Sequence, residues 1–81
     1  MLDLKQLAVF VRVAESGSLT KAAIVLDLAR SGVSRQLQDL EGEIGHKLFH
    51  RTGRGMLLSD NGKKLLPRAK QLLSDAQQLE D

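Results

Sequence analysis

Apolar residues recur along this chain with the period of an α-helix in four segments, separated by glycine and short polar stretches. The pattern predicts helices over residues 3–16, 18–26, 30–44 and 59–79. Two short apolar runs, 48–49 and 56–58, flank a basic stretch that contains glycine, which is typical of a β-hairpin with a tight turn. We therefore predict a mainly α-helical fold, in which three helices and a two-stranded hairpin are followed by a long final helix.

Most of the predicted helices carry end signals at their boundaries. N-cap side chains are available at Asp3, Ser18 and Ser59, and Gly17 and Gly45 can end the helices that precede them. Gln6 follows Asp3 by three residues, which predicts a reciprocal capping box at the first helix.

The start of the third helix is the exception. Ala29 has no side-chain oxygen for the first N–H groups, and Ser31 could cap only if the helix began late, with Arg30 left in the turn. A lost cap costs about 1 kcal/mol, whereas each fully buried side chain on the face of Val33 and Leu37 contributes about 1.5–3 kcal/mol. We therefore expect the helix to begin at Arg30 or Ser31 without a side-chain cap.

The second and third helices, joined by a tight turn at residues 27–29, have the arrangement of a helix-turn-helix. Ala22 and Ala23 are small, as two closely crossing helices require. Since Val33 and Leu37 face inward, the outer face of the third helix carries Arg30, Ser31, Ser34, Arg35 and Gln38. The leading end of such a helix meets base edges in duplex DNA, and a guanidinium fork matches both guanine and phosphate. The alternative is that these side chains are only solvated surface.

The hairpin and the segment after it form the basic part of the chain. The net charge is +2, but residues 45–70 hold seven Lys/Arg and one acid, whereas residues 71–81 hold three acids and no base. Arg51 and Arg54, at or near the hairpin tip, could enter a minor groove or hold the DNA backbone, unless the tip serves only solubility. Ser18 and Thr20 could bind phosphate, although capping alone would explain Ser18.

The final helix carries an apolar stripe beyond its first turns. Its members alternate at spacings of four and three and are Leu65, Ala69, Leu72, Ala76 and Leu79. This spacing favours pairing with a second helix, and hence a homodimer, although the stripe could instead pack on its own domain. A seam of about two heptads is weak, so that the dimer can dissociate in solution.

Other classes of function lack the residues they need. Cysteine is absent, and His46 and His50 lie at a turn and a strand where they do not converge, so we expect no metal and no cofactor. Ser31 and Ser34 have no histidine or acid at a suggestive spacing, which argues against an enzyme. No signal peptide or membrane-spanning stretch is evident, and the expected location is the cytoplasm.

Several motifs together resemble the N-terminal DNA-binding domain of LysR-type bacterial transcriptional regulators. They are L-x-x-L-x-x-F at 4–10, A-A-x-x-L at 22–26, V-S-R-Q-L at 33–37, L-E-x-E-x-G-x-x-L-F-x-R-T at 40–52 and L-S-x-x-G at 58–62. The resemblance implies a winged helix-turn-helix at 1–58 and a linker helix at 59–81 that pairs with a second subunit. It also implies contacts to double-stranded DNA from Arg30, Ser31, Gly32, Ser34 and Arg35 in the major groove, and from Arg51 and Arg54 at the wing.

The resemblance further implies a separate regulatory domain that senses a small-molecule effector, which this chain does not contain. The family commonly has Ser-Gln-Pro-Ala where this chain has residues 29–32 as Ala-Arg-Ser-Gly. A basic residue in place of the usual amide shifts the expected base preference from adenine toward guanine. The rival prediction is a protein-interaction module that has lost DNA contact, and a steep salt dependence of DNA binding would distinguish the two.

Overall fold

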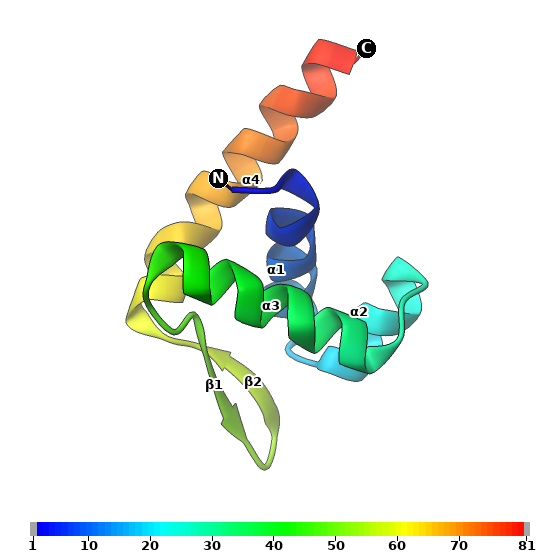
Figure 1. The fold of residues 1–81 in the computed structure, drawn as a ribbon, viewed down its shortest axis with the longest axis vertical. Helices are drawn as coiled ribbons and strands as arrows, with labels where there is room; N and C mark the ends of the chain where they lie inside the picture. The colour runs from blue at the N-terminus through cyan, green and yellow to red at the C-terminus, as the bar shows by residue number, and fades with distance from the viewer. Residues whose placement is uncertain (1, 81) are drawn as a thin grey trace.

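A computed structural model describes residues 2–80 and contains the predicted elements in the predicted order. The helices are α1 (Leu4–Ser16), α2 (Leu19–Leu26), α3 (Arg30–Ile44) and α4 (Asp60–Glu80), and the strands are β1 (Phe49–Thr52) and β2 (Gly55–Leu58). In Figure 1, α1 lies behind α3, the β-hairpin projects from one end of the molecule and α4 rises toward the other. The prediction of a mainly helical winged helix-turn-helix with a long final helix is confirmed.

The core is aliphatic around a single aromatic pair. Phe10 of α1 and Phe49 of β1 lie with ring centroids 5.4 Å apart at an interplanar angle of 56°, within the range of favourable tilted pairs. The largest fully buried side chains around them are Leu7, Val13, Val33, Leu40 and Leu48. Because these residues come from α1, α3 and the segment before β1, their burial fixes both which face of α3 is exposed and where the base of the hairpin lies.

The helix ends follow the predicted signals with one correction. The Asp3 carboxylate accepts from the Lys5 backbone N–H at 2.7 Å, whereas Gln6 Oε1 is buried without a hydrogen-bond partner among the described residues. The capping box at Asp3 and Gln6 is therefore wrong, since Gln6 is turned into the protein and not back to the cap. Helix α3 begins at Arg30 after Ala29, which makes no side-chain cap bond, and this confirms the prediction for that boundary.

Three connections hold the hairpin against the helices. The Glu41 carboxylate accepts from the Leu48 N–H at 2.7 Å, and the Met56 N–H donates to the Gly17 carbonyl at 3.0 Å. Buried Ser59 donates its hydroxyl to the Lys47 carbonyl at 2.6 Å and its N–H to the Leu48 carbonyl at 2.9 Å. The hairpin is thus tied to α3, to the α1–α2 loop and to the start of α4.

Close backbone approach at the start of α4 requires a glycine. A Cβ added at buried Gly62 would overlap the Leu48 carbonyl oxygen and lie 2.9 Å from Leu58 Cδ2. The Ser59 hydroxyl also accepts from the Gly62 N–H at 3.0 Å, so Ser59 caps α4 as predicted. The contact brings α4 directly against the base of the hairpin.

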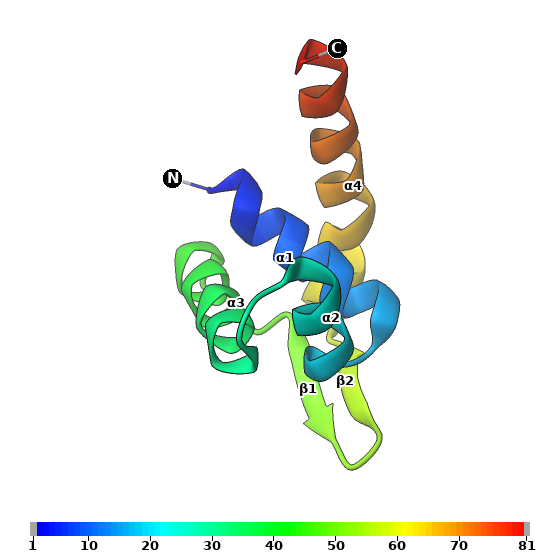
Figure 2. The same cartoon turned by 90° about the vertical axis from the view of Figure 1, so that its right-hand side faces the viewer.

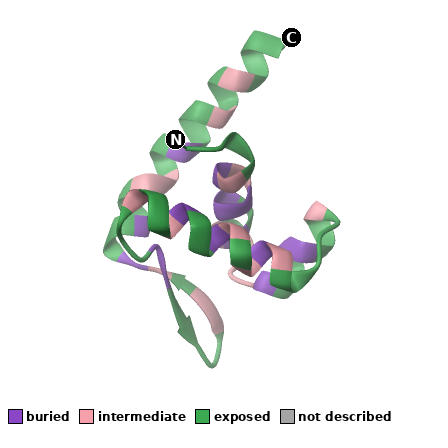
Figure 3. Cartoon of the chain, in the orientation of Figure 1, coloured by how far each residue is buried: buried purple, intermediate pink, exposed green. Residues whose placement is uncertain are grey.

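Helix α4 has two halves with different surroundings. Its first half packs on the core through buried Ala69 and partly buried Leu65 and Leu66, with partly buried Leu73 at the start of the second half, and α4 contacts α1. The second half extends away from the body of the domain, as Figure 2 shows, and is largely exposed in Figure 3. Leu72 and Leu79 are 47% and 89% exposed there.

Candidate nucleic-acid interface

The outer face of α3 presents the side chains predicted for it. Val33, Leu37 and Leu40 are buried, which turns Arg35 and Gln38 to solvent on the opposite face. Arg30 and Ser31 are exposed in the first turn of the helix. A Cβ at Gly32 would meet no atom within 4 Å, so this position leaves open space on the same turn, where a groove edge could approach the backbone.

The start of α2 lies beside this surface. The Ser18 hydroxyl accepts from the Lys21 N–H at 3.1 Å, so Ser18 is an N-cap, while Thr20 is exposed. A hollow of about 130 Å³ is lined by Ser18 and Thr20 together with Arg30, Arg51 and Thr52. Three segments that are far apart in the sequence thus place hydroxyls and guanidinium groups around one depression.

The two wing arginines differ in position. Arg54 is exposed in the turn between the strands. Its backbone N–H donates to the Thr52 hydroxyl at 3.1 Å, and this hydroxyl donates to the Gly55 carbonyl at 3.2 Å. Arg51 lies within β1, paired with Met56, and its Nη2 donates to the Ser34 hydroxyl at 3.0 Å. Both arginines were expected at or near the tip: Arg54 lies in the turn itself, whereas Arg51 lies in β1 with its side chain directed at α3.

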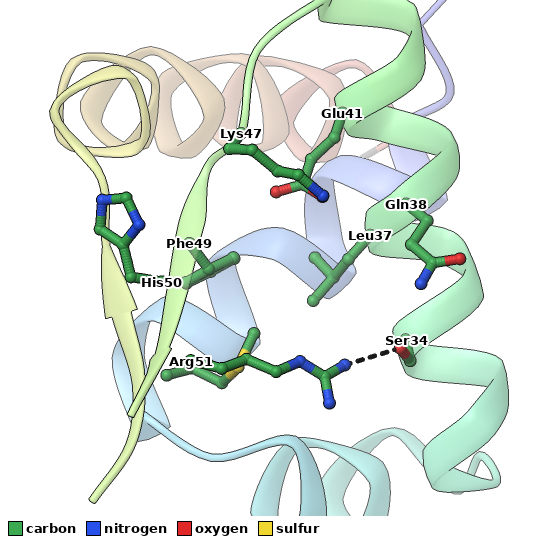
Figure 4. Close-up of a pocket in the computed structure, with 9 residues that line it drawn as sticks. Ser34, Leu37, Gln38, Glu41, Lys47, Phe49, His50 and Arg51 are labelled. Carbon is green, nitrogen blue, oxygen red and sulfur yellow. Dashed lines mark hydrogen bonds and ion pairs between the residues drawn. The ribbon is translucent and has the colours of Figure 1, made fainter. Parts of the chain in front are cut away.

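A second hollow, of about 360 Å³, lies between α3 and β1 (Figure 4). Figure 4 shows the Arg51–Ser34 hydrogen bond at one end of it and the Glu41 and Lys47 side chains at the other. Lys47 Nζ is 3.8 Å from Glu41 Oε1, while Oε2 accepts from the Leu48 N–H. The carboxylate is therefore already paired with donors from its own chain.

The sequence did not reveal the roles of Glu41 and Ser59 in holding the wing, or the Arg51–Ser34 bond. Glu41 belongs to the L-E-x-E motif, so its identity was noted, but nothing in the pattern indicates that it accepts from a backbone N–H seven residues later. Ser59 was expected to cap α4, and its bond to the Lys47 carbonyl depends on chain segments 12 residues apart.

Three other expectations can be compared with the geometry. Among residues 2–80, no three His, Cys, Asp or Glu side chains gather as a metal-binding group. Ala69 is fully buried within its own chain, so it has no surface to offer a second subunit, and its predicted place in the dimer seam is wrong. Leu65 is partly buried against the same core, Ala76 is half-buried, and Leu72 and Leu79 stay exposed. Within the described residues, no helix combines the length and apolarity needed to cross a membrane.

The profile of the bacterial regulatory helix-turn-helix proteins of the lysR family matches residues 4–63. The uncharacterized HTH-type transcriptional regulator YeiE of Escherichia coli K12 is 44% identical over 79 residues, which is 98% of this chain and 27% of that protein. The nitrogen assimilation regulatory protein nac of E. coli K12 is 39% identical over 77 residues, or 95% of this chain and 25% of that protein. The chain thus spans about a quarter of the length of these relatives.

Among solved structures, the DNA complex of the CbnR DNA-binding domain superposes with a TM-score of 0.94 at 34% identity, and covers 99% of this chain and 92% of that one. The complex of the BenM DNA-binding domain with benA site 1 DNA gives a TM-score of 0.91 at 38% identity, over 96% of this chain and 91% of that one. The fold and the exposed face of α3 define a winged helix-turn-helix protein. The chain belongs to the lysR family of bacterial regulatory proteins and forms its helix-turn-helix domain.

Proposed function

We propose that this chain binds duplex DNA in a sequence-specific manner as the DNA-binding domain of a LysR-type transcriptional regulator, in the bacterial cytoplasm. The observation that carries the proposal is that α3 and the wing, which pack on the same core, both carry exposed arginines. These are Arg30 and Arg35 on α3 and Arg51 and Arg54 on the wing. The DNA complexes of the CbnR and BenM domains, which share this fold, support it.

In this proposal α3 lies in the major groove and the wing reaches the adjacent minor groove. Arg35 and Arg30 contact base edges, with Ser31, Gln38 and the open backbone at Gly32 beside them. Arg30 favours guanine, because a guanidinium pairs with the two acceptors that guanine shows in the major groove. Ser18 and Thr20 lie where a phosphate can approach, and Arg54 at the turn is placed to enter a narrow minor groove.

We further propose that the chain pairs with a second copy through the exposed half of α4, so that residues 1–58 bind DNA and residues 59–81 link two subunits. Leu72, Ala76 and Leu79 form the free part of the stripe. Lys63, Lys64, Arg68 and Lys70 lie in the first half of α4, and Asp75 and Glu80 lie in the second. A seam formed by the two exposed halves leaves the basic side chains of the first half outside it, so the apolar residues of the stripe carry the pairing.

The relatives are about four times longer than this chain, which fits a regulator whose other domain senses a small molecule. We propose that effector binding belongs to that domain and that this chain supplies the DNA contact. Nothing in the geometry of residues 2–80 favours a catalytic role, since the exposed face carries arginines, hydroxyls and an amide without an acid-base pair.

The test is selection of bound sites from a random duplex pool, followed by titration of the selected duplex. We expect enrichment of a two-fold symmetric site, log K that falls steeply with log salt, and a loss of about 1–3 kcal/mol for Arg35→Ala. A pool without enrichment, or an affinity that does not respond to salt, would contradict the proposal. An unchanged affinity for Arg35→Ala would remove this residue from the contacts.

A further inference from the structure

The hydrogen bond between Arg51 and Ser34 joins the wing directly to the recognition helix. Arg51 Nη2 donates to Ser34 Oγ at 3.0 Å, across 17 residues of sequence. Figure 4 shows the Arg51 side chain extended from β1 toward α3, with the bond at one end of the hollow between them. The bond holds a guanidinium group in the gap between the two elements that are proposed to enter neighbouring grooves.

The chemistry of the pair leaves donors free on both sides. A serine hydroxyl that accepts from arginine still has its own proton to donate, and a guanidinium with one N–H engaged retains four others. Both side chains can therefore donate to a further acceptor. Within residues 2–80 neither is paired with a carboxylate, and Glu41, which lines the same hollow, pairs with the Leu48 N–H and Lys47 at its far end. The pair is therefore suited to an anionic acceptor.

A DNA strand supplies such an acceptor at this place. When a helix occupies the major groove and a wing the adjacent minor groove, the sugar–phosphate strand between the two grooves must pass between helix and wing. Arg51 borders both the 360 Å³ hollow and the 130 Å³ hollow, so a strand that follows this path meets it from either side. Gln38 lines the first hollow, and Thr20 and Arg30 line the second.

We propose that Ser34 and Arg51 form one phosphate clamp on the strand between the grooves. Arg51 binds the phosphate and does not read the minor groove, and Ser34 is a positioning residue that aims the guanidinium and does not discriminate bases. This inference rests on the proposed DNA binding and deepens it, since it assigns a chemical class of contact to two residues that pattern alone grouped with the base-reading and tip positions.

A double-mutant cycle tests the clamp. The probe is a fluorescent duplex that the wild-type chain selects from a random pool, and the variants are Ser34→Ala, Arg51→Ala and the double variant. We expect Ser34→Ala to weaken binding by about 3- to 10-fold in the wild-type background but less than about twofold when Arg51 is already alanine. Additive effects would overturn the proposal.

The salt slope separates this role from a merely structural one. Arg51→Ala should lower the slope of log K against log salt by about 1. Ser34→Ala should lower it as well, by a part of that amount, although it removes no charge, because the released guanidinium no longer holds its phosphate. Ser34→Thr retains a hydroxyl and should restore both affinity and slope. A slope that is unchanged in Ser34→Ala would contradict the positioning role.

Ser31 and Arg54 provide matched controls on the same elements. Ser31→Ala removes a hydroxyl one turn earlier on α3, and its loss of DNA affinity should be additive with that of Arg51→Ala. Arg54→Ala removes the arginine at the tip, and its loss of affinity should be additive with that of Ser34→Ala. Arg51→Lys keeps the charge without the fork, so it should retain the slope but lose coupling to Ser34. Circular dichroism establishes that each variant is folded.

The outcomes distinguish the clamp from the function on which it rests. If the wild-type chain binds no duplex, the proposed function fails. If it binds with a steep salt slope but the Ser34–Arg51 cycle is additive, only the clamp fails. If the Ser34 and Arg51 variants lose affinity by the same factor for the selected duplex and for a scrambled one, the contact is to phosphate. If they lose affinity for the selected duplex alone, these residues read bases and the clamp is contradicted.

Discussion

Replacing Gly62 with alanine should destabilise the domain, although the same change inside a helix ordinarily stabilises it. Alanine is favoured over glycine by up to about 1 kcal/mol in a helix. At Gly62, however, the new Cβ would overlap the Leu48 carbonyl oxygen and lie 3.2 Å from the Leu48 carbonyl carbon and 2.9 Å from Leu58 Cδ2. A backbone carbonyl cannot rotate away as a flexible side chain can, so α4 and the base of the hairpin must separate.

The cost follows from what this separation breaks. Overpacking in a core costs about 1–3 kcal/mol. The bonds from buried Ser59 to the Lys47 and Leu48 carbonyls, at 2.6 and 2.9 Å, would lengthen, and each contributes about 1 kcal/mol. After subtraction of the gain in helix propensity, we expect Gly62→Ala to lower the free energy of unfolding by about 1–2 kcal/mol, or roughly 4–16 °C in Tm for a domain of this size.

Urea denaturation followed by far-UV circular dichroism measures the change, at a protein concentration low enough to avoid linkage to dimerisation. Gly42→Ala is the matched control, because Gly42 lies inside α3 and a Cβ there would meet nothing within 4 Å. It should raise stability by up to about 1 kcal/mol. A Gly62→Ala variant at least as stable as the wild type, with Gly42→Ala stabilised as expected, would refute the close-approach argument.

Three further changes test the remaining geometry. Ala29→Ser should stabilise the protein by about 1 kcal/mol in a thermal melt, because it supplies the side-chain cap that α3 lacks. No gain would mean that the first backbone N–H groups of α3 already have hydrogen-bond partners. Glu41→Ala should lower the free energy of unfolding by about 1–3 kcal/mol, because it leaves the buried Leu48 N–H unpaired, and Glu41→Gln should recover most of this stability. Equal losses in the two variants would show that the charge of Glu41, and not its hydrogen bond, is responsible. Leu72→Ser with Leu79→Ser should shift sedimentation toward monomer while stability changes by less than about 0.5 kcal/mol, and an unchanged distribution would contradict the proposed seam.

The placement of the recognition face could be predicted because its signals are local. The spacing of Val33, Leu37 and Leu40 defines the buried side of one helix and, by the helical period, also its exposed side. Burial of that side outweighs the missing cap at Ala29, so both the existence of α3 and its start followed from the sequence. The hairpin could also be predicted, since two glycines mark its turn and a short apolar run on either side marks each strand.

Errors arose where the outcome depends on how distant segments meet. The periodicity that placed Ala69 with Leu72 and Leu79 on one stripe is correct for the isolated helix, but Ala69 is buried in the core of its own chain while the two leucines stay exposed. Gln6 fits a capping pattern, yet packing turns it inward. A periodic pattern states which residues share a face and does not state what covers that face.

The sequence by itself therefore determined the elements, their order, the outward face of α3 and the family of the chain, because helix periodicity, caps and turn residues act over a few neighbours. Only the tertiary structure decided how the wing is held and where its arginines point. The anchors at Glu41 and Ser59 and the bond from Arg51 to Ser34 join segments 7, 12 and 17 residues apart, and their geometry exists only after the core has brought those segments together.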